Sequence, residues 1–237
     1  MTTVKTVPPH LLPLALLVML LAPWPAVAGL QYDMLEETYA LNGESEGARL
    51  LRIFVVGQAV RVEAEGEVTI VDLQQLAMYR LDVGAKRYDQ TDLRTFGSQL
   101  PRIEGQAGQM LESILQQAFQ TQIVPTNEFD EVAGYNCQEH VVSSLLFNGD
   151  YCLSREVVGF DQVRSLGIKA GQALEENPLA RQINFPLLME SLAGFPVRSV
   201  TRTLDGTVVM TMQQSREKGL QPALFKVPAG YRRVGAP

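Results

Sequence analysis

The chain has 237 residues, a formal net charge of −6 at pH 7 and a hydrophobic fraction of 46%, which suit a single globular domain with a sizeable core. The negative net charge argues against nucleic acid and against an anionic membrane surface as partners. His140 is the only histidine after residue 28, so a transition-metal site of paired imidazoles within one subunit is excluded, and we expect neither a metal ion nor a cofactor.

The first 28 residues have the composition of a secretory signal peptide. Lys5 is their single charge, an apolar run extends from Leu11 to Ala22, and Ala26-Val27-Ala28 ends the segment. This pattern predicts export with cleavage after residue 28, which leaves residues 29–237 as one periplasmic domain. An uncleaved anchor is the alternative, but the apolar run is shorter than the roughly 20 residues of a spanning helix. No cysteine near the cleavage point offers a site for lipid attachment, and no later segment is apolar enough to span a bilayer.

Strand patterns dominate the first part of the mature chain. Apolar side chains in residues 59–65 alternate with Arg61, Glu63 and Glu65, which indicates an antiparallel strand with one packed face and one face in water. The turns between neighbouring segments are too short for the crossovers of a parallel sheet. We therefore expect an antiparallel meander with strands at Gln31–Ala40, Ala48–Val56, Ala59–Ala64, Glu67–Leu73, Leu76–Val83 and Lys86–Gln90.

Helical patterns follow the meander. Apolar residues between Ala107 and Phe119 recur every three or four positions, which predicts an amphipathic helix that covers one face of the sheet. A second helix is expected from an N-cap at Asp161 to a stop before Pro178, and a short third piece from Pro186 to Gly194. The residues of the second helix expected to point inward are Val163, Leu166, Ala170, Ala173 and Leu174.

Two further hairpins are predicted in the second half of the chain. Asn148-Gly149 and Asp205-Gly206 are strong turn signals, and each is flanked by segments of strand character. The expected strands are a segment through Val142 with its return at Tyr151–Val158, and the pair Val197–Leu204 and Thr207–Met212. The last apolar anchors are Leu224, Phe225, Val227 and Tyr231.

Cys137 and Cys152 are the only cysteines, and we expect them to form a disulfide because exported thiols tend to be oxidised. A tight turn at Asn148-Gly149 would place Cys152 opposite Leu145, so the bond requires a bulge, a wider loop or strands that bend together. Two buried free cysteines are the alternative. A redox-active pair is disfavoured because the Cys-x-x-Cys spacing is missing.

No catalytic residue is predicted. His140 near Ser143 and Ser144 has neither a nucleophile elbow nor a second histidine as base, so we expect a surface or hydrogen-bonded strand histidine. The carboxylates of Glu63, Glu65 and Glu67 match no calcium loop and indicate a solvated face.

One apolar set has functional promise because it includes methionines, whose side chains adapt to irregular apolar ligands. The alternative is that these residues fill an ordinary core. The candidate ligand-binding residues are Met110, Leu111, Ile114, Leu115, Phe119, Leu187, Leu188, Met210 and Met212.

Several motifs resemble an uncharacterised family of exported bacterial proteins similar to the LolA/LolB lipoprotein carriers. They are Val60-Arg61-Val62-Glu63, Ile70-Val71-Asp72-Leu73, Val132 to Cys137, Gly194-Phe195-Pro196-Val197 and Leu224 to Tyr231. The resemblance implies an α+β fold: a strongly curved antiparallel sheet, or unclosed barrel, with helices covering its concave face and an apolar cavity between.

The resemblance also implies a function, because the cavity of the carriers takes acyl chains and no catalytic residue transfers from them. The lipid-anchoring cysteine of the outer-membrane acceptor is missing, so the chain resembles the soluble carrier. We expect a non-enzymatic periplasmic binding protein for a lipid, an acyl chain or a lipidated partner such as a lipoprotein. The alternative is an envelope interaction or structural module with a filled core and no ligand.

Overall fold

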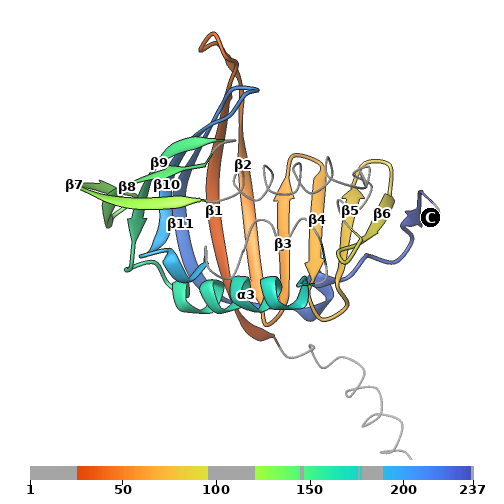
Figure 1. The fold of residues 1–237 in the computed structure, drawn as a ribbon. Coiled ribbons are helices and arrows are strands. Elements are labelled where there is room, and N and C mark those ends of the chain that lie inside the picture. The colour runs from red at the N-terminus through yellow and green to blue at the C-terminus, as the bar shows by residue number, and fades with distance from the viewer. Residues whose placement is uncertain (1–25, 96–120, 145–146, 176, 178–188, 236–237) are drawn as a thin grey trace, which may run out of the picture.

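The computed structural model describes residues 26–95, 121–144, 147–175, 177 and 189–235. Within them lies one 12-stranded sheet with the order β12-β6-β5-β4-β3-β2-β1-β11-β10-β9-β8-β7. All neighbouring strands are antiparallel except β12 and β6, which form a two-residue parallel pair. The sheet is curved and unclosed, because β12 and β7 lie at separate edges (Figure 1).

The strands fall into two meanders that meet where β11 pairs with β1. The first comprises β1 (Val27–Tyr39), β2 (Ser45–Val56), β3 (Ala59–Ala64), β4 (Glu67–Asp72), β5 (Ala77–Asp82) and β6 (Arg87–Asp92). The second comprises β7 (Gln122–Val132), β8 (Tyr135–Ser143), β9 (Asn148–Ser154), β10 (Phe195–Arg202) and β11 (Thr207–Leu220). The remaining elements are α3 (Phe160–Ala173), the 3-10 helix η1 (Pro222–Phe225) and β12 (Arg232–Arg233). The predicted antiparallel meander is confirmed, and β3 has the expected bounds.

One face of the sheet, called the α3 face here, packs against α3. The pairing of Tyr32 with Ile53 places both side chains on this face, and Val163 and Leu166 of α3 join them in one apolar cluster. Tyr32 is 1% exposed. Figure 1 shows α3 running across the strands near one end of the sheet. Its 14 residues give a length of about 21 Å, which suits a helix that crosses several strands about 4.8 Å apart.

The opposite face, called the outer face here, is covered in part by the C-terminal segment. Leu220 and Phe225 pack on Phe54, and Tyr231 packs against the buried cluster of β4 and β5. The Arg61 guanidinium donates to the Leu224 carbonyl at 2.9 Å, and its side chain is only 12% exposed. The expectation that Arg61 lies on a solvated face is therefore wrong, because residues 163 positions later in the chain cover it.

Both predicted hairpins of the second half form, but the first turns at a different place. Ser143 pairs with Asn148, so the loop is Ser144 to Phe147, and Asn148-Gly149 already lies within β9. The two-residue turn at Asn148-Gly149 is thus corrected. The second hairpin closes through residues 203–206, where the Thr203 amide donates to the Gly206 carbonyl at 2.8 Å.

The predicted second helix is present as α3, with two corrections. Its N-cap is Gly159, with φ 76°, in place of Asp161, which lies in the first turn. Leu166 is buried as expected, whereas Ala173 is exposed. The predicted Ala107–Phe119 helix lies outside the described residues, as do residues 186–188 of the predicted Pro186–Gly194 piece, whose residues 189–191 are helical. No helix in the described ranges is long and apolar enough to cross a membrane.

Candidate functional site

The predicted ligand-binding residues are placed only in part. Met212 is 1% exposed within the apolar cluster of the α3 face, and Met210 packs against the same cluster. The register of β1 and β11 sets Met212 opposite Met34, so these side chains fill the core beside α3. The other candidates, Met110, Leu111, Ile114, Leu115, Phe119, Leu187 and Leu188, lie outside the described residues.

Cys137 and Cys152 form the predicted disulfide, with Cα atoms 5.3 Å apart. Cys152 pairs with Glu139, two residues beyond Cys137, so the bond runs diagonally between β8 and β9. The loop between Ser143 and Asn148 is wider than a two-residue turn, which is one of the features that the predicted disulfide required. A buried disulfide is typical of proteins that fold in an oxidising compartment.

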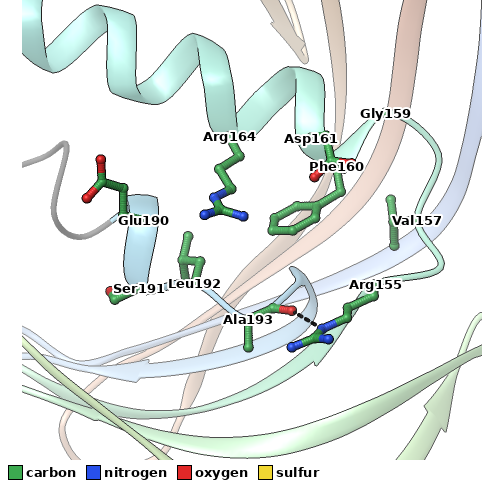
Figure 2. A pocket seen from close by; sticks show the side chains of 10 residues that line it. All are labelled: Arg155, Val157, Gly159, Phe160, Asp161, Arg164, Glu190, Ser191, Leu192 and Ala193. Carbon is green, nitrogen blue, oxygen red and sulfur yellow. Dashed lines mark hydrogen bonds between the residues drawn. The ribbon is translucent and has the colours of Figure 1, made fainter.

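An open pocket of about 680 Å³ lies where the chain enters α3. Residues 155–164 form one wall and residues 190–193 the other (Figure 2). The Phe160 ring and the Arg164 side chain extend from the start of α3 into the space beside Leu192. This volume falls within the range of small-molecule sites, about 300 to 1,000 Å³.

Tyr32 of β1 contacts both the loop before α3 and β10. Its hydroxyl donates to the Val158 carbonyl of the loop at 2.8 Å, and its ring stacks on Phe195 of β10 with centroids 4.9 Å apart. Gly159 follows in a left-handed conformation, and a Cβ there would lie 2.3 Å from a methyl group of Leu30. Only glycine therefore satisfies both the backbone angle and the close packing that form this wall.

The second wall is held by backbone contact with β9. A Cβ at Gly194 would lie 2.6 Å from the carbonyl of Ser154, so a residue without a side chain is required for this approach. The Arg155 guanidinium donates to the Ala193 carbonyl at 2.9 Å, which Figure 2 shows as a bridge between the walls. The geometry of the pocket thus depends on residues 38 positions apart.

Charges of both signs surround an apolar floor. Val157 lines the pocket and is also a buried member of the α3-face cluster. Arg155, Asp161 and Arg164 belong to one wall and Glu190 to the other. Arg164 makes no ion pair with any residue in the described part of the chain. Its guanidinium is therefore available to an anionic group bound at the pocket mouth.

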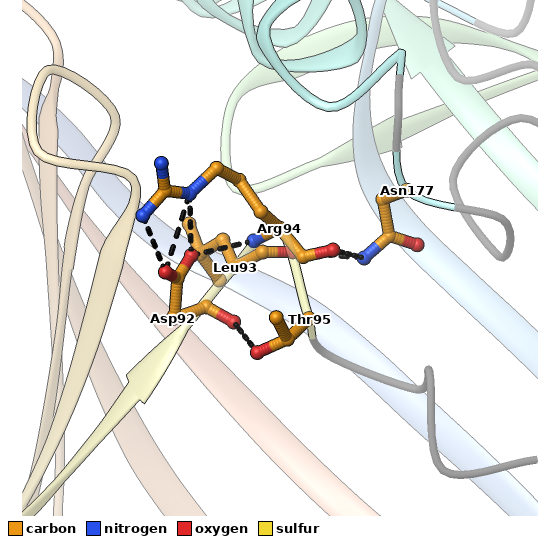
Figure 3. A network of polar contacts seen from close by, with 5 residues as sticks. All are labelled: Asp92, Leu93, Arg94, Thr95 and Asn177. Atoms are coloured by element: carbon orange, nitrogen blue, oxygen red, sulfur yellow. Dashed lines mark hydrogen bonds and ion pairs between the residues drawn. The ribbon is translucent and has the colours of Figure 1, made fainter.

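The far end of α3 is tied to the opposite part of the sheet. Asn177 is 3% exposed, and its side-chain amide nitrogen donates to the carbonyls of Leu93 and Arg94 at 2.8 and 3.2 Å. Figure 3 shows this contact beside the ion pair of Arg94 with Asp92. Hydrogen bonds from Arg94 lower the pKa of the Asp92 carboxyl. The helix is thus anchored at β1 by its start and at the end of β6 by the residues that follow it.

A second pocket, of about 390 Å³, shares Arg155 and Ala193 with the first. His140 lines it and is 4% exposed, with Nδ1 2.9 Å from the Gln138 carbonyl. This agrees with the expected hydrogen-bonded strand histidine. Ser143 and Ser144 are not among the residues that line this pocket. No group of three or more His, Cys, Asp or Glu residues in the described segments is arranged to hold a metal ion.

Sequence reasoning missed the pocket at the start of α3. Arg155, Phe160, Arg164 and Leu192 carry no motif. Gly159 and Gly194 were the available signals, since an isolated glycine beside a helix or strand often marks close backbone approach.

Comparisons with known proteins give a family and little more. No curated protein matches the chain. Two structures of PNGF-II, in the C2 and P21 space groups, are similar with a TM-score of 0.40 each and 10% and 8% identity. The matches cover 87% and 89% of this chain but only 30% and 32% of PNGF-II, so the chain spans about a third of that protein. Residues 47–231 match the family described as "Domain of unknown function (DUF4412)", and the chain belongs to this family.

Proposed function

We propose that the protein is a non-enzymatic, exported binding protein that holds an acyl chain or another lipid with an anionic head group. The observation that carries this proposal is the open pocket of about 680 Å³ at the start of α3. An acyl chain would lie along Val157, Phe160 and Leu192, and its head group would meet the Arg164 guanidinium. The proposal places the ligand at this pocket and leaves Met210 and Met212 in the core.

Apolar burial and a charge-assisted hydrogen bond would both contribute to affinity. Burying one methylene group is worth about 0.8 kcal/mol and micromolar binding corresponds to about 8 kcal/mol, so burial alone would need about ten methylene groups. A hydrogen bond to a charged group contributes about 1.5–3 kcal/mol. The nearby Asp161 and Glu190 favour a head group of one negative charge over a multiply charged one.

Titration of the delipidated protein with a fluorescent fatty acid tests the proposal, together with native mass spectrometry of freshly purified protein. Leu192→Asp places a carboxylate on the pocket wall, and Arg164→Gln removes the expected head-group partner. We expect each to weaken binding at least tenfold. Arg216→Gln is the matched control, because Arg216 lies on β11, its side chain is 43% exposed, and it contacts Asp33 at 3.8 Å and Gln214 at 3.2 Å, away from the pocket.

An envelope interaction module without a ligand is the second candidate. The burial of Met212 in the apolar cluster supports it, because that part of the interior is filled. Under this hypothesis no fatty acid binds, and the Leu192→Asp and Arg164→Gln variants behave as the wild type. Preparations that contain no lipid and do not bind the fluorescent fatty acid would therefore favour the interaction module.

A further inference from the structure

Basic residues far apart in the sequence meet at the β6/β12 edge of the sheet. Arg232 of β12 pairs with Arg87 of β6, and Arg233 pairs with Tyr88. The Arg232 amide donates to the Lys86 carbonyl at 3.0 Å, and the Val234 amide donates to the Tyr88 carbonyl at 2.7 Å. Lys86, Arg87, Arg232 and Arg233, called the basic edge here, are therefore neighbours although 145 positions separate Arg87 from Arg232.

The basic edge has a local charge opposite to that of the chain. Residues 80–89 and 230–235 contain five Lys or Arg residues and two Asp residues, a net charge of +3, against −6 for the whole chain. Arg87 lies 3.6 Å from Asp82, with both side chains about half exposed. Lys86, Arg232 and Arg233 make no ion pair within the described residues. Three cationic groups are thus left to meet an anionic partner.

Packing holds these charges together. Like charges on adjacent strands repel each other, so electrostatics alone would separate β12 from β6. Tyr231, directly before β12, packs with Tyr79 and Tyr88 against the buried Val68, Ile70 and Leu81 of the outer face. The chain therefore keeps Arg232 beside Arg87 through apolar contacts that lie on the outer face.

Two exposed valines accompany the charges. Val83, in the turn before β6, and Val234, directly after β12, are 43% and 42% exposed. Val234 also lines a surface pocket in which Arg80 and Arg87 lie among the carboxylates of Glu67, Asp82 and Asp89, so among the described residues the unpaired charges of the edge are those of Lys86, Arg232 and Arg233. Clustered basic residues with exposed apolar side chains suit the interface of an anionic bilayer, where the charges meet lipid head groups and the apolar groups enter the boundary layer.

We propose that the basic edge binds an anionic lipid surface. Net charge argues against such a partner, but screening limits electrostatic interactions to about 8 Å at physiological ionic strength. The local charge of the edge therefore governs contact with a membrane. This proposal is independent of the acyl-chain pocket, because the two sites share no residue.

Co-sedimentation with vesicles tests the basic edge, using phosphatidylglycerol mixed with phosphatidylcholine and, separately, phosphatidylcholine alone. We expect binding only to the mixed vesicles and its loss at 0.5 M salt, a concentration of about three times the physiological one. Arg232→Gln/Arg233→Gln should weaken binding at least tenfold, since each basic residue near the surface contributes about fivefold. Circular dichroism checks that the variant remains folded.

The control carries the same change in net charge elsewhere. Arg49→Gln/Arg202→Gln alters two exposed arginines of other strands, which pair with Glu36 and Asp150, and should bind as the wild type does. Equal losses in both double variants would overturn the proposal, as would equal binding to the two vesicle types. Binding to polyglutamate without binding to vesicles would assign the edge to an acidic protein and also overturn it.

Discussion

Replacing Tyr32 with phenylalanine removes one hydroxyl from the buried junction between β1 and the loop before α3. The ring, which stacks on Phe195, is retained. The lost group belongs to Tyr32, which is 1% exposed, and donates to the Val158 carbonyl at 2.8 Å. Because Val158 is 37% exposed, we count only the net contribution of one hydrogen bond, about 0.5–1.5 kcal/mol, and expect Tyr32→Phe to lower the free energy of unfolding by this amount at pH 7.

The same residue makes a signed prediction for alkaline pH. Burial raises the pKa of the Tyr32 phenol, and an electrostatic interaction with Tyr135 raises it further. A raised pKa in the folded state stabilises the fold fully below the unfolded value of about 10. That contribution is lost as pH rises from there toward the folded pKa, because the unfolded chain releases the proton first. The slope for one proton is up to about 1.4 kcal/mol per pH unit.

Urea unfolding of wild type and Tyr32→Phe between pH 7 and 11 measures both effects. The stability difference between the two proteins should be constant up to about pH 9.5 and then shrink as pH rises. Tyr39→Phe is the control, because the Tyr39 hydroxyl donates only to Glu37, at 3.3 Å, and its loss should cost about 0.5 kcal/mol or less. A difference that stays constant to pH 11 would refute the assigned role of burial.

Three other changes probe the scaffold. Cys137→Ser/Cys152→Ser should lower the free energy of unfolding by about 3 kcal/mol, since the bond closes a loop of 15 residues. Urea unfolding of the protein with and without reductant measures this contribution, and a wild-type stability that reductant leaves unchanged would contradict the prediction. Gly159→Ala should lower the free energy of unfolding more than Gly66→Ala does. Both glycines have positive φ, but only Gly159 has Leu30 within 2.3 Å of the added Cβ. The Gly66 variant reports the backbone cost alone, about 1–2 kcal/mol, and equal losses of stability in the two variants would refute the steric argument. Arg198→Gln should reduce the loss of stability at acid pH. Hydrogen bonds from the Glu131 amide and from Arg198 lower the pKa of Asp130, so the contribution of this carboxylate to stability is present above the ordinary carboxyl pKa and is lost as pH falls through the lowered value. Urea midpoints from pH 2 to 6 measure the change.

The strands of the first meander were predictable because their signal is local. Alternation in residues 59–64 and glycines at the turns define β3 without reference to any other part of the chain. The Asn148-Gly149 turn failed for the complementary reason. Ser143 pairs with Asn148 across a four-residue loop, and the preference of Asn-Gly for a tight turn was outweighed by the wider register that the Cys137–Cys152 bond accompanies.

The cover on the outer face was predictable only in its residues. Leu224, Phe225 and Tyr231 were expected to be apolar anchors, and all three pack on the sheet. The sequence did not indicate which strands these anchors cover. Arg61 was therefore predicted to lie on a solvated face, although its guanidinium donates to the Leu224 carbonyl. A period-two pattern reports which side chains share a face, and it says nothing about what covers that face.

The contacts of the candidate site and of the basic edge lie where distant parts of the chain meet. Arg155 bridges to Ala193 across the pocket, Asn177 holds the end of β6, and Arg232 lies beside Arg87. In each case one partner lies in a strand or directly beside it. The other, Ala193, Asn177 or Arg232, lies in a later segment that is not consecutive with that strand. Periodicity identified the sheet because the strands of each meander are consecutive. The basic edge forms only where β12 returns to β6, and the net charge of the whole chain, −6, does not show such a local cluster of positive charge.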